Sequence, residues 1–412
     1  MTKNITKKIK FTDKGICAPK GFRASGVHVG FRENQKKKDL GLLVSDVMCN
    51  AFAVHTQNKV KGAPILVNRE HLKDGKAQGI VVNSGNANTC APNGVQVARE
   101  TCRLAADALG LKAEDLLVCS TGVIGQEINI ETFERGIPRV VKKLSYDDSE
   151  SLARSIMTTD KITKQVAVSF EVAGKMCHIG AVAKGSGMIN PNMATMLSFL
   201  TTDVSISREM LRTALLNDVA DTYNQIYIDG DTSTNDTVAI LANGLAGNPE
   251  IDAPGAEFDL FCEALNQVTV TLCRLLAKDG EGATKLIECV VKNAPTKRIA
   301  RIVSSSVVGS DLVKTAIFGE DANWGRVLCA VGYADADFEC AHIDVVLSSQ
   351  AGDILVCKGS EAVNFSEEKA AKILACDEIR IDVDLHDGSK DAVAYGCDLT
   401  FGYVRINGRY RS

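Results

Sequence analysis

Short apolar runs separated by turns dominate the first ninety residues. The runs GLLVSDVMCNAFAVHT, APILVN and QGIVVNSGNANTC, all within Gly15 to Cys90, are bounded by glycine, proline or polar clusters, which is typical of strands. Between Asn93 and Gly110 the apolar residues recur at helical spacing and the run ends in glycine. This segment predicts an amphipathic helix with a glycine cap, and LLVCSTGVIG then predicts another strand.

Strands and helices alternate through the rest of the chain. We expect helices over 130–143, with a break at Pro138, and over 147–157, followed by strands at QVAVSFEVAG and HIGAVAKGSG. A buried strand over Met196 to Asp203 precedes helices at SREMLRTALLNDVADTYN and over Ala256 to Lys278. The strand LIECVVKN, the helix VGSDLVKTAIFG and the strands RIDVDLHDG and YGCDLTFGYVRIN complete the pattern. The sequence therefore predicts an α/β protein, and 412 residues indicate two lobes.

Composition and charge exclude several classes of protein. Hydrophobic residues make up 45% of the chain and charged residues 24%, which is typical of a soluble globular protein. The formal net charge is −4 and basic clusters are short, such as Lys36-Lys37-Lys38, so no nucleic-acid partner is predicted. No apolar run follows the N-terminal lysines, and no stretch approaches the roughly 18 apolar residues of a membrane span. We expect a cytoplasmic protein with no membrane partner.

The cysteines and histidines lack the spacing of metal ligands. The 14 cysteines are spread singly without a CxxC pair, which is typical of reduced, buried thiols in a reducing compartment. The six histidines form no HxxxH pair that would place two imidazoles on one helix face. The sequence therefore predicts no metal site.

The segment KGSGMINPNMATMLSF stands out for its chemistry. It brings together two glycines, a proline, a small residue and a hydroxyl: Gly185, Gly187, Pro191, Ala194 and Thr195. A strained turn could direct the Thr195 hydroxyl at the preceding carbonyl, and cleavage by an N-to-O shift would leave Thr195 with a free α-amino group. With a reference pKa of about 7.7 to 8, that amine could be the base for its own hydroxyl. The residues alone nevertheless favour a structural Thr195 at the start of a buried strand.

The longer string AKGSGMINPNMATMLSFLTTD strongly resembles the ornithine acetyltransferase / glutamate N-acetyltransferase (ArgJ) family of arginine biosynthesis. Other stretches that resemble the family run along the whole chain: APKGFRASGV, DLGLLVSD, NSGNANTC, CSTGVIG, IMTTD, DGDTSTNDT, EGATKLIE, GEDANWGR and YVRINGRYRS. The resemblance implies a layered αββα-type sandwich, similar to self-cleaving aminopeptidases, with no metal or organic cofactor. It also implies cleavage between Ala194 and Thr195 into an α chain, 1–194, and a β chain, 195–412, assembled as α2β2.

The resemblance further implies an acetyl transfer with Thr195 as nucleophile. Thr195 would take acetyl from N2-acetyl-L-ornithine, release ornithine, and pass the acetyl group to L-glutamate to give N-acetylglutamate, a ping-pong route. The oxyanion hole of the family maps onto Thr121 and Gly122 of CSTGVIG. The substrate-binding positions map onto Thr158, Lys184, Thr195, Glu281, Asn407 and Ser412. The sequence leaves open whether acetyl-CoA is also a donor, which would make the enzyme bifunctional.

Several of these positions also suit structural roles when taken singly. Lys184 would pass for a solvated lysine at a strand end, Glu281 for a helix-end glutamate paired with Lys285, and Asn407 for part of a mobile tail. The tail INGRYRS departs from the family, where many relatives have an Ala-Asp pair before the tyrosine and a terminal threonine; Ser412 keeps the hydroxyl. The polar motifs 83–89, NSGNANT, and 229–237, DGDTSTNDT, are expected to shape the site or its walls, without an assigned role.

Two other functions use the same residues differently. An N-terminal-nucleophile amidohydrolase or aminopeptidase would employ Thr195 but pass the acyl group to water, so the acceptor decides between the two enzymes. A binding protein with a purely structural Thr195 would keep one uncut chain and would still bind its ligand after Thr195→Ala.

Overall fold

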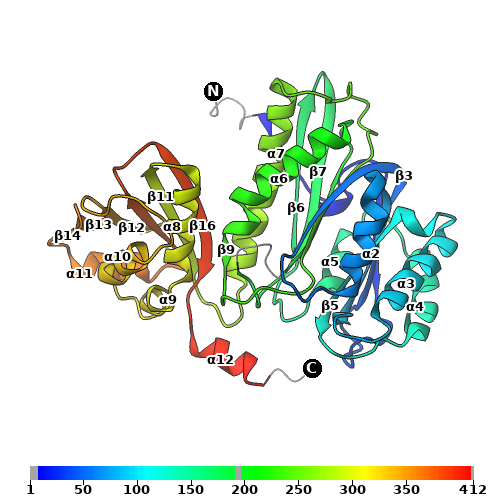
Figure 1. Ribbon diagram of the computed structural model, residues 1–412, viewed down its shortest axis with the longest axis horizontal. Coiled ribbons are helices and arrows are strands. Elements are labelled where there is room, and N and C mark those ends of the chain that lie inside the picture. The colour runs from blue at the N-terminus through cyan, green and yellow to red at the C-terminus, as the bar shows by residue number, and fades with distance from the viewer. Residues whose placement is uncertain (1–7, 191–195, 410–412) are drawn as a thin grey trace.

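The computed structural model describes residues 8–190 and 196–409 and shows two α/β lobes side by side (Figure 1). In the larger lobe the strands form one mixed sheet in the order β1-β6-β7-β8-β10-β3-β4-β5, with β2 paired to β3. These strands are β1 (Lys10–Phe11), β2 (Phe22–Val27), β3 (Leu40–His55), β4 (Lys76–Asn86), β5 (Leu116–Val123), β6 (Lys164–Val172), β7 (Lys175–Lys184), β8 (Leu197–Thr202) and β10 (Thr237–Ala242). The layered α/β fold with two lobes that the sequence predicts is confirmed.

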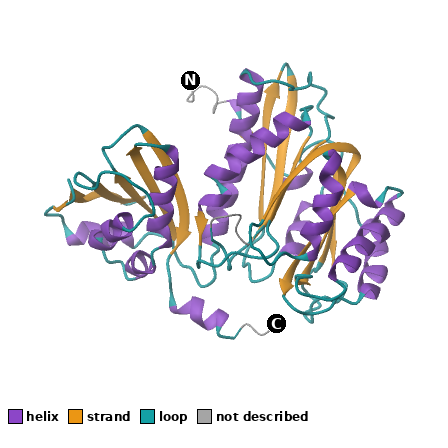
Figure 2. Cartoon of the chain, in the orientation of Figure 1, coloured by secondary structure: helices purple, strands orange, loops and turns teal. Residues whose placement is uncertain are grey.

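Helices cover both faces of this sheet (Figure 2), and strand β8 shows how the sequence permits it. Leu197 and Phe199 pack with α5 on one face, whereas Leu200 packs with α6 and α7 on the other. All six residues of the strand are buried, including the hydroxyl residues Ser198, Thr201 and Thr202, so the strand has no solvent-exposed polar face. The helices of this lobe are α2 (Ala63–His71), α3 (Gly94–Leu109), α4 (Ile130–Lys142), α5 (Ser149–Ile156), α6 (Arg208–Asp221) and α7 (Ala256–Lys278).

The smaller lobe has a second sheet in the order β14-β13-β12-β15-β11-β16-β9. Its strands are β9 (Ile226–Tyr227), β11 (Leu286–Ala294), β12 (Asp344–Ser349), β13 (Gly352–Lys358), β14 (Glu361–Ala362), β15 (Glu378–Asp384) and β16 (Lys390–Cys397). Its helices are α8 (Lys297–Gly309), α9 (Asp311–Phe318), α10 (Trp324–Gly332) and α11 (Glu367–Leu374). These helices share one apolar core with the inner face of the sheet.

Helix α7 joins the two lobes. It packs on β6 and β7 of the larger sheet and also contacts β11 and β16 of the smaller one. Its apolar stripe, which includes the fully buried Leu265 and Leu272, belongs to the core of the larger lobe. Within residues 8–190 and 196–409, α7 is the one helix that is long and apolar enough to cross a membrane, but more than half of its apolar window is buried in the protein. Helix α7 is therefore a core helix here.

Three sequence predictions of secondary structure are wrong. The run APILVN is not a strand but the start of α2, where Pro64 occupies the first turn and its missing N–H is not needed. Helix α4 continues through Pro138 without the expected break. The predicted last strand ends at Cys397, and Phe401–Asn407 form helix α12, which the Thr400 hydroxyl caps by accepting a hydrogen bond from the Gly402 N–H.

The proposed division of the chain at 194/195 falls inside the larger sheet. Strand β7 precedes it and strand β8 follows it, and the two strands are antiparallel neighbours, with Lys184 opposite Leu197. On its other side β8 pairs in parallel with β10, where Thr237 lies opposite Leu197. Two pieces cut at this point would thus remain hydrogen-bonded strands of one sheet.

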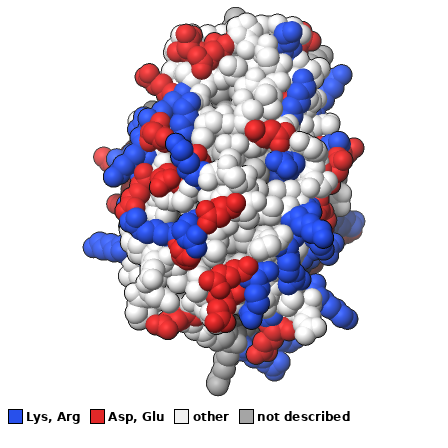
Figure 3. Space-filling model, turned by 90° about the vertical axis from the view of Figure 1, so that its right-hand side faces the viewer, with Lys and Arg blue, Asp and Glu red and all other residues white. Residues whose placement is uncertain are grey.

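The surface seen from the right-hand side of Figure 1 has no single sign of charge. Acidic and basic side chains are interspersed over this face (Figure 3). In the same lobe, Arg103 of α3 forms ion pairs with Glu100 and Asp107, and Arg99 of α3 pairs with Glu70 of α2. This face therefore lacks the concentrated basic stripe that a nucleic-acid backbone attracts.

Strand β7 passes very close to the N-terminal turn Gly15–Cys17, and a Cβ on Gly180 would collide with the carbonyl oxygen of Gly15. We expect Gly180→Ala to lower the free energy of unfolding by about 1–3 kcal/mol, measured by urea denaturation. Gly332→Ala is the matched control, since an added methyl group there meets nothing within 4 Å. An equal loss of stability in both variants would contradict this packing argument.

Candidate active site

A pocket of about 150 Å³ lies in the larger lobe, where loops after several of its strands and helices meet. Its size suits a small metabolite more than a large cofactor. The pocket is lined by six of the residues that the resemblance marks: Thr121, Gly122, Thr158, Lys184, Glu281 and Asn407. They come from β5, β7, α12 and the segments after α5 and α7, so only the fold brings them together. Ala194, Thr195 and Ser412 lie outside the described residues.

Thr121 and Gly122 lie near the end of β5, in parallel register with the end of β4. Gly122 has a φ of 132°, and a Cβ at this position would collide with the backbone of Gly85, so only glycine fits. The Lys184 Nζ donates a hydrogen bond of 3.4 Å to the Thr121 Oγ1. A hydroxyl that accepts from lysine keeps its own hydrogen, so Thr121 can donate to an oxygen in the pocket.

Lys184 ends strand β7 and is the buried cation of the pocket, with 3% of its surface exposed. Burial lowers its pKa below the ordinary lysine value, and the nearby carboxylate of Asp160 partly opposes this shift. A buried ammonium in a pocket of this size is suited to pairing with the carboxylate of an amino acid.

A buried charge network lies behind the pocket, and sequence reasoning missed it. Lys164 is fully buried and binds the carboxylates of Asp160 at 2.7 Å and Asp279 at 2.6 Å. Asp160 also accepts hydrogen bonds from the N–H groups of Thr158 at 2.9 Å and Gly185 at 2.8 Å. The neighbouring Lys164 holds the pKa of Asp160 below its usual range against the opposing effect of burial. The network thereby fixes the Thr158 loop and the end of β7.

The other charged group of the pocket, Glu281, follows α7 and meets the C-terminal helix. Its N–H donates to the Ser186 carbonyl at 2.7 Å, which joins it to the segment after β7. Its Oε2 accepts a hydrogen bond of 2.7 Å from the Asn407 Nδ2. Helix α12 reaches from the smaller lobe beneath the larger one (Figure 1), so the chain around Asn407 does fold onto the pocket.

The two polar motifs of unassigned role form one wall of the pocket. Ala87 of NSGNANT and Asn235 of DGDTSTNDT both line it, together with Ser233 and Thr234. The Asn235 Nδ2 donates to the Ala87 carbonyl at 2.6 Å, and the Thr89 Oγ1 donates to the Asn235 Oδ1 at 2.6 Å. The expectation that these motifs shape the walls thus agrees with the structure. Within the described ranges, no group of three or more His, Cys, Asp or Glu residues could hold a metal ion.

Comparison with known proteins gives relatives along nearly the whole chain. The sequence pattern of the ArgJ family matches residues 23–412. The arginine biosynthesis bifunctional protein ArgJ of Caldanaerobacter subterraneus subsp. tengcongensis is 49% identical, over 98% of this chain and 100% of its own. The protein of the same name from Symbiobacterium thermophilum is 48% identical, over 97% of this chain and 98% of its own. The chain belongs to the ArgJ family.

The solved structure of a family member is similar as well. The arginine biosynthesis bifunctional protein ArgJ from Bacillus halodurans is 46% identical with a TM-score of 0.50, and its crystallised chain covers 52% of this chain and 100% of its own length. Membership of the ArgJ family over residues 23–412 makes the present protein an enzyme of acetyl transfer in arginine biosynthesis.

The environment of Lys184 predicts a shift in the pH dependence of the ArgJ reaction. Asp160→Asn removes the carboxylate that favours the charged form of Lys184, so the pKa of Lys184 should fall further. As the pH rises, Lys184 loses its proton and its attraction for a substrate carboxylate. We therefore expect the fall in kcat/KM with rising pH to begin at a lower pH in Asp160→Asn than in the wild-type enzyme.

Asp279→Asn is the matched control for this pH profile, because it removes the other carboxylate bound to Lys164 but leaves Asp160 in place. It should lower stability without moving the pH at which kcat/KM falls. A profile for Asp160→Asn that coincides with the wild type would contradict the role given to Asp160.

Proposed function

We propose that this ArgJ protein cleaves itself between Ala194 and Thr195, and then moves acetyl from N2-acetyl-L-ornithine to L-glutamate through an ester on Thr195. The observation that carries the proposal is the pocket, which gathers side chains from both sides of the cleavage position, including Thr121 and Lys184 before it and Glu281 after it. The oxyanion, substrate-binding and nucleophile roles below belong to this proposal.

Self-cleavage would begin with attack of the Thr195 Oγ on the carbonyl carbon of Ala194. The C–N bond breaks, the nitrogen takes up the hydroxyl proton, and an ester joins the two pieces. Water then hydrolyses the ester, so residues 1–194 end in a carboxylate and Thr195 gains a free α-amino group. That amine has a reference pKa of about 7.7 to 8 and can deprotonate the neighbouring hydroxyl.

Acetyl transfer would then proceed in two matched halves. In the first, the Thr195 Oγ attacks the acetyl carbonyl of N-acetylornithine, its proton passes through the α-amine to the departing amine, and ornithine leaves. In the second, the amine of glutamate attacks the acetyl ester, and N-acetylglutamate leaves with Thr195 restored. Each tetrahedral intermediate carries an oxyanion, for which the Thr121 hydroxyl and the backbone at Gly122 are the proposed donors.

The two charged residues of the pocket suit different parts of the substrates. Lys184 would pair with the α-carboxylate that N-acetylornithine and glutamate share, and Glu281 would bind the cationic side chain of ornithine, with its carboxylate oriented by Asn407. Thr158, held by Asp160, would bind the amide or the carboxylate. Ser412 is proposed to add a hydroxyl from the chain end.

The remaining parts of the proposal rest on composition and resemblance. We propose that the reaction needs no metal or organic cofactor, that the enzyme is cytoplasmic, and that the pieces assemble as α2β2. The Bacillus halodurans chain, which covers 52% of this chain, supports the cut because residues 195–412 make up a similar share.

An N-terminal-nucleophile hydrolase is the alternative, and the fate of the acetyl group separates the two. Incubation with N-acetylornithine and glutamate should yield N-acetylglutamate and ornithine in equal amounts, with little free acetate, as measured by liquid chromatography and mass spectrometry. Thr195→Ala should reduce the rate by about a thousandfold or more. Acetate as the main product would identify a hydrolase, and an active Thr195→Ala variant would place the nucleophile elsewhere.

The question of a second donor is tested in the same assay. Acetyl-CoA with glutamate should give N-acetylglutamate above the Thr195→Ala background if the enzyme is bifunctional, as the names of its relatives indicate for them. If glutamate is acetylated with N-acetylornithine but not with acetyl-CoA, the enzyme has a single donor.

A further inference from the structure

The motif 229–237, which forms a wall of the pocket, also holds the chain on the upstream side of the proposed cleavage position. The Asp229 carboxylate accepts hydrogen bonds from two successive N–H groups, that of Met188 at 2.6 Å and that of Ile189 at 2.8 Å. The next residue, Asn190, donates from Nδ2 to the Gly230 carbonyl at 2.7 Å. The chain is therefore fixed by the motif up to residue 190.

The other end of the motif holds the chain on the downstream side. The Met196 N–H donates to the Asp236 Oδ1 at 3.0 Å, and the Thr237 N–H donates to the Met196 carbonyl at 3.1 Å. From Leu197 onward the chain is strand β8, paired on both sides. Because the Met196 nitrogen is bonded to the carbonyl carbon of Thr195, Asp236 holds the peptide bond that directly follows the proposed nucleophile.

We infer that Asp229 and Asp236 are positioning residues for self-cleavage, which together hold both ends of the five-residue stretch 191–195 that contains the scissile bond. The inference rests on the proposed self-cleavage. A hydroxyl attacks the preceding carbonyl only when the two are about 3–3.5 Å apart and aligned. Fixing a residue costs backbone entropy, so a stretch with anchored ends needs less further ordering to react.

The Asp236 side chain carries a second sign of a specific role. It is buried with 1% exposure, and its Oδ2 has no hydrogen-bond partner among the described residues. Burial raises the pKa of this carboxyl well above its ordinary value. A buried carboxyl oxygen without a hydrogen bond destabilises a fold, so a residue chosen only for stability would not be expected here.

Asp229 also contacts a second segment of the chain, helix α12. Besides the Met188 and Ile189 N–H groups, its Oδ2 accepts a hydrogen bond of 3.2 Å from the Tyr403 hydroxyl of α12. Tyr403 lies one turn before Asn407, whose side chain binds Glu281. Asp229 therefore also contacts helix α12, which contributes Asn407 to the lining of the pocket.

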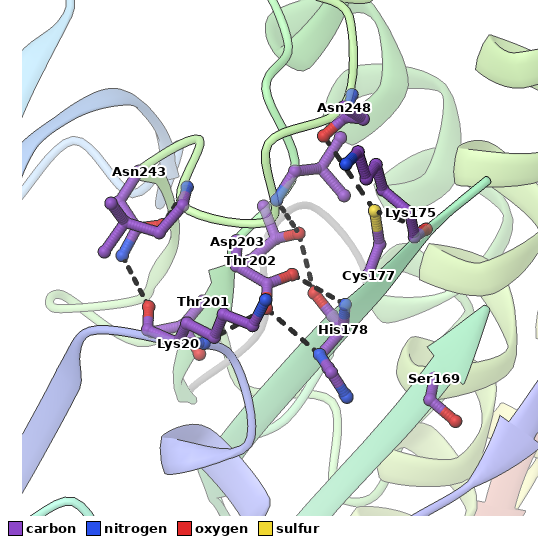
Figure 4. Close-up of polar contacts among 12 residues, drawn as sticks. Lys20, Ser169, Lys175, Cys177, His178, Thr201, Thr202, Asp203, Asn243 and Asn248 are labelled. Atoms are coloured by element: carbon purple, nitrogen blue, oxygen red, sulfur yellow. Dashed lines mark hydrogen bonds and ion pairs between the residues drawn. The ribbon is translucent and has the colours of Figure 1, made fainter. Parts of the chain in front are cut away.

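Asp203 provides a matched control within the same sheet. It follows the far end of β8, about 23 Å along the strand from Met196 at 3.3 Å per residue. It is fully buried and accepts backbone hydrogen bonds from the His178 N–H at 2.7 Å and the Lys20 N–H at 3.1 Å (Figure 4). Asp203 thus resembles Asp236 in burial, and like Asp229 and Asp236 it accepts backbone hydrogen bonds. It also contacts the His178 Nδ1 at 3.0 Å, and its hydrogen bonds do not reach either side of 191–195.

The test follows cleavage of freshly synthesised precursor over time, by denaturing gel and by intact mass, starting from the 44.0 kDa chain. Asp229→Ala and Asp236→Ala should slow cleavage on the order of 100-fold. Asp236→Asn keeps an oxygen that accepts from the Met196 N–H, so it should recover most of the rate. Asp203→Ala should cleave at the wild-type rate, even though its thermal midpoint falls as much as those of the other two.

Each contrary outcome has a distinct meaning. Wild-type cleavage rates in folded Asp229→Ala and Asp236→Ala would overturn the positioning role while leaving self-cleavage intact. Equal slowing in Asp203→Ala would assign the effect to lost stability and would overturn it too, as would an Asp236→Asn variant as slow as Asp236→Ala. A wild-type chain that stays at 44.0 kDa would instead contradict the proposed self-cleavage itself, and the positioning role with it.

Discussion

Strand β8 is hydrogen-bonded to β7 on one side and to β10 on the other, in the middle of the larger sheet. This pairing sets Lys184, Leu197 and Thr237 side by side, and it therefore brings the end of β7 and the motif that precedes β10 to the start of β8. A cut just before β8 would separate the chain without separating the sheet. The same hydrogen bonds thus explain how a new N-terminus could be made inside a folded protein and stay at its pocket.

Buried polar groups, more than apolar packing, set the shape of that pocket. Lys164 lies between the carboxylates of Asp160 and Asp279, and Asp160 also binds the backbone N–H groups of Thr158 and Gly185. Taking such ions out of water costs several kcal/mol each, so a network of this kind is weak evidence for stability. Its retention is better explained by placement, because it joins the Thr158 loop to the end of β7. The motif 229–237 likewise holds the wall of the pocket that contains Ala87, through the hydrogen bond from Asn235.

The periodicity of the sequence was sufficient for most strands and helices, and α7 has the predicted bounds, Ala256–Lys278. Short apolar runs were the exception: APILVN and 401–407 fit a strand or a helix equally well, and tertiary packing decided for the helix. The site residues came from resemblance, since Thr121, Lys184 and Glu281 look ordinary in isolation. Asp160, Lys164 and Asp236 were missed because the sequence does not show that they are buried; the spacing of Asp160 and Lys164 alone is common on exposed helices.

The central claim is that Thr195, freed at the start of residues 195–412, carries the acetyl group between donor and acceptor. The most direct measurement is intact-mass spectrometry of the enzyme, quenched after mixing with N-acetylornithine in the absence of glutamate. The account predicts two chains, of which the one that begins at Thr195 is heavier by one acetyl group, and fragmentation should place that group on Thr195. A chain still intact across 194/195, or an acetyl group on any other residue, would contradict it.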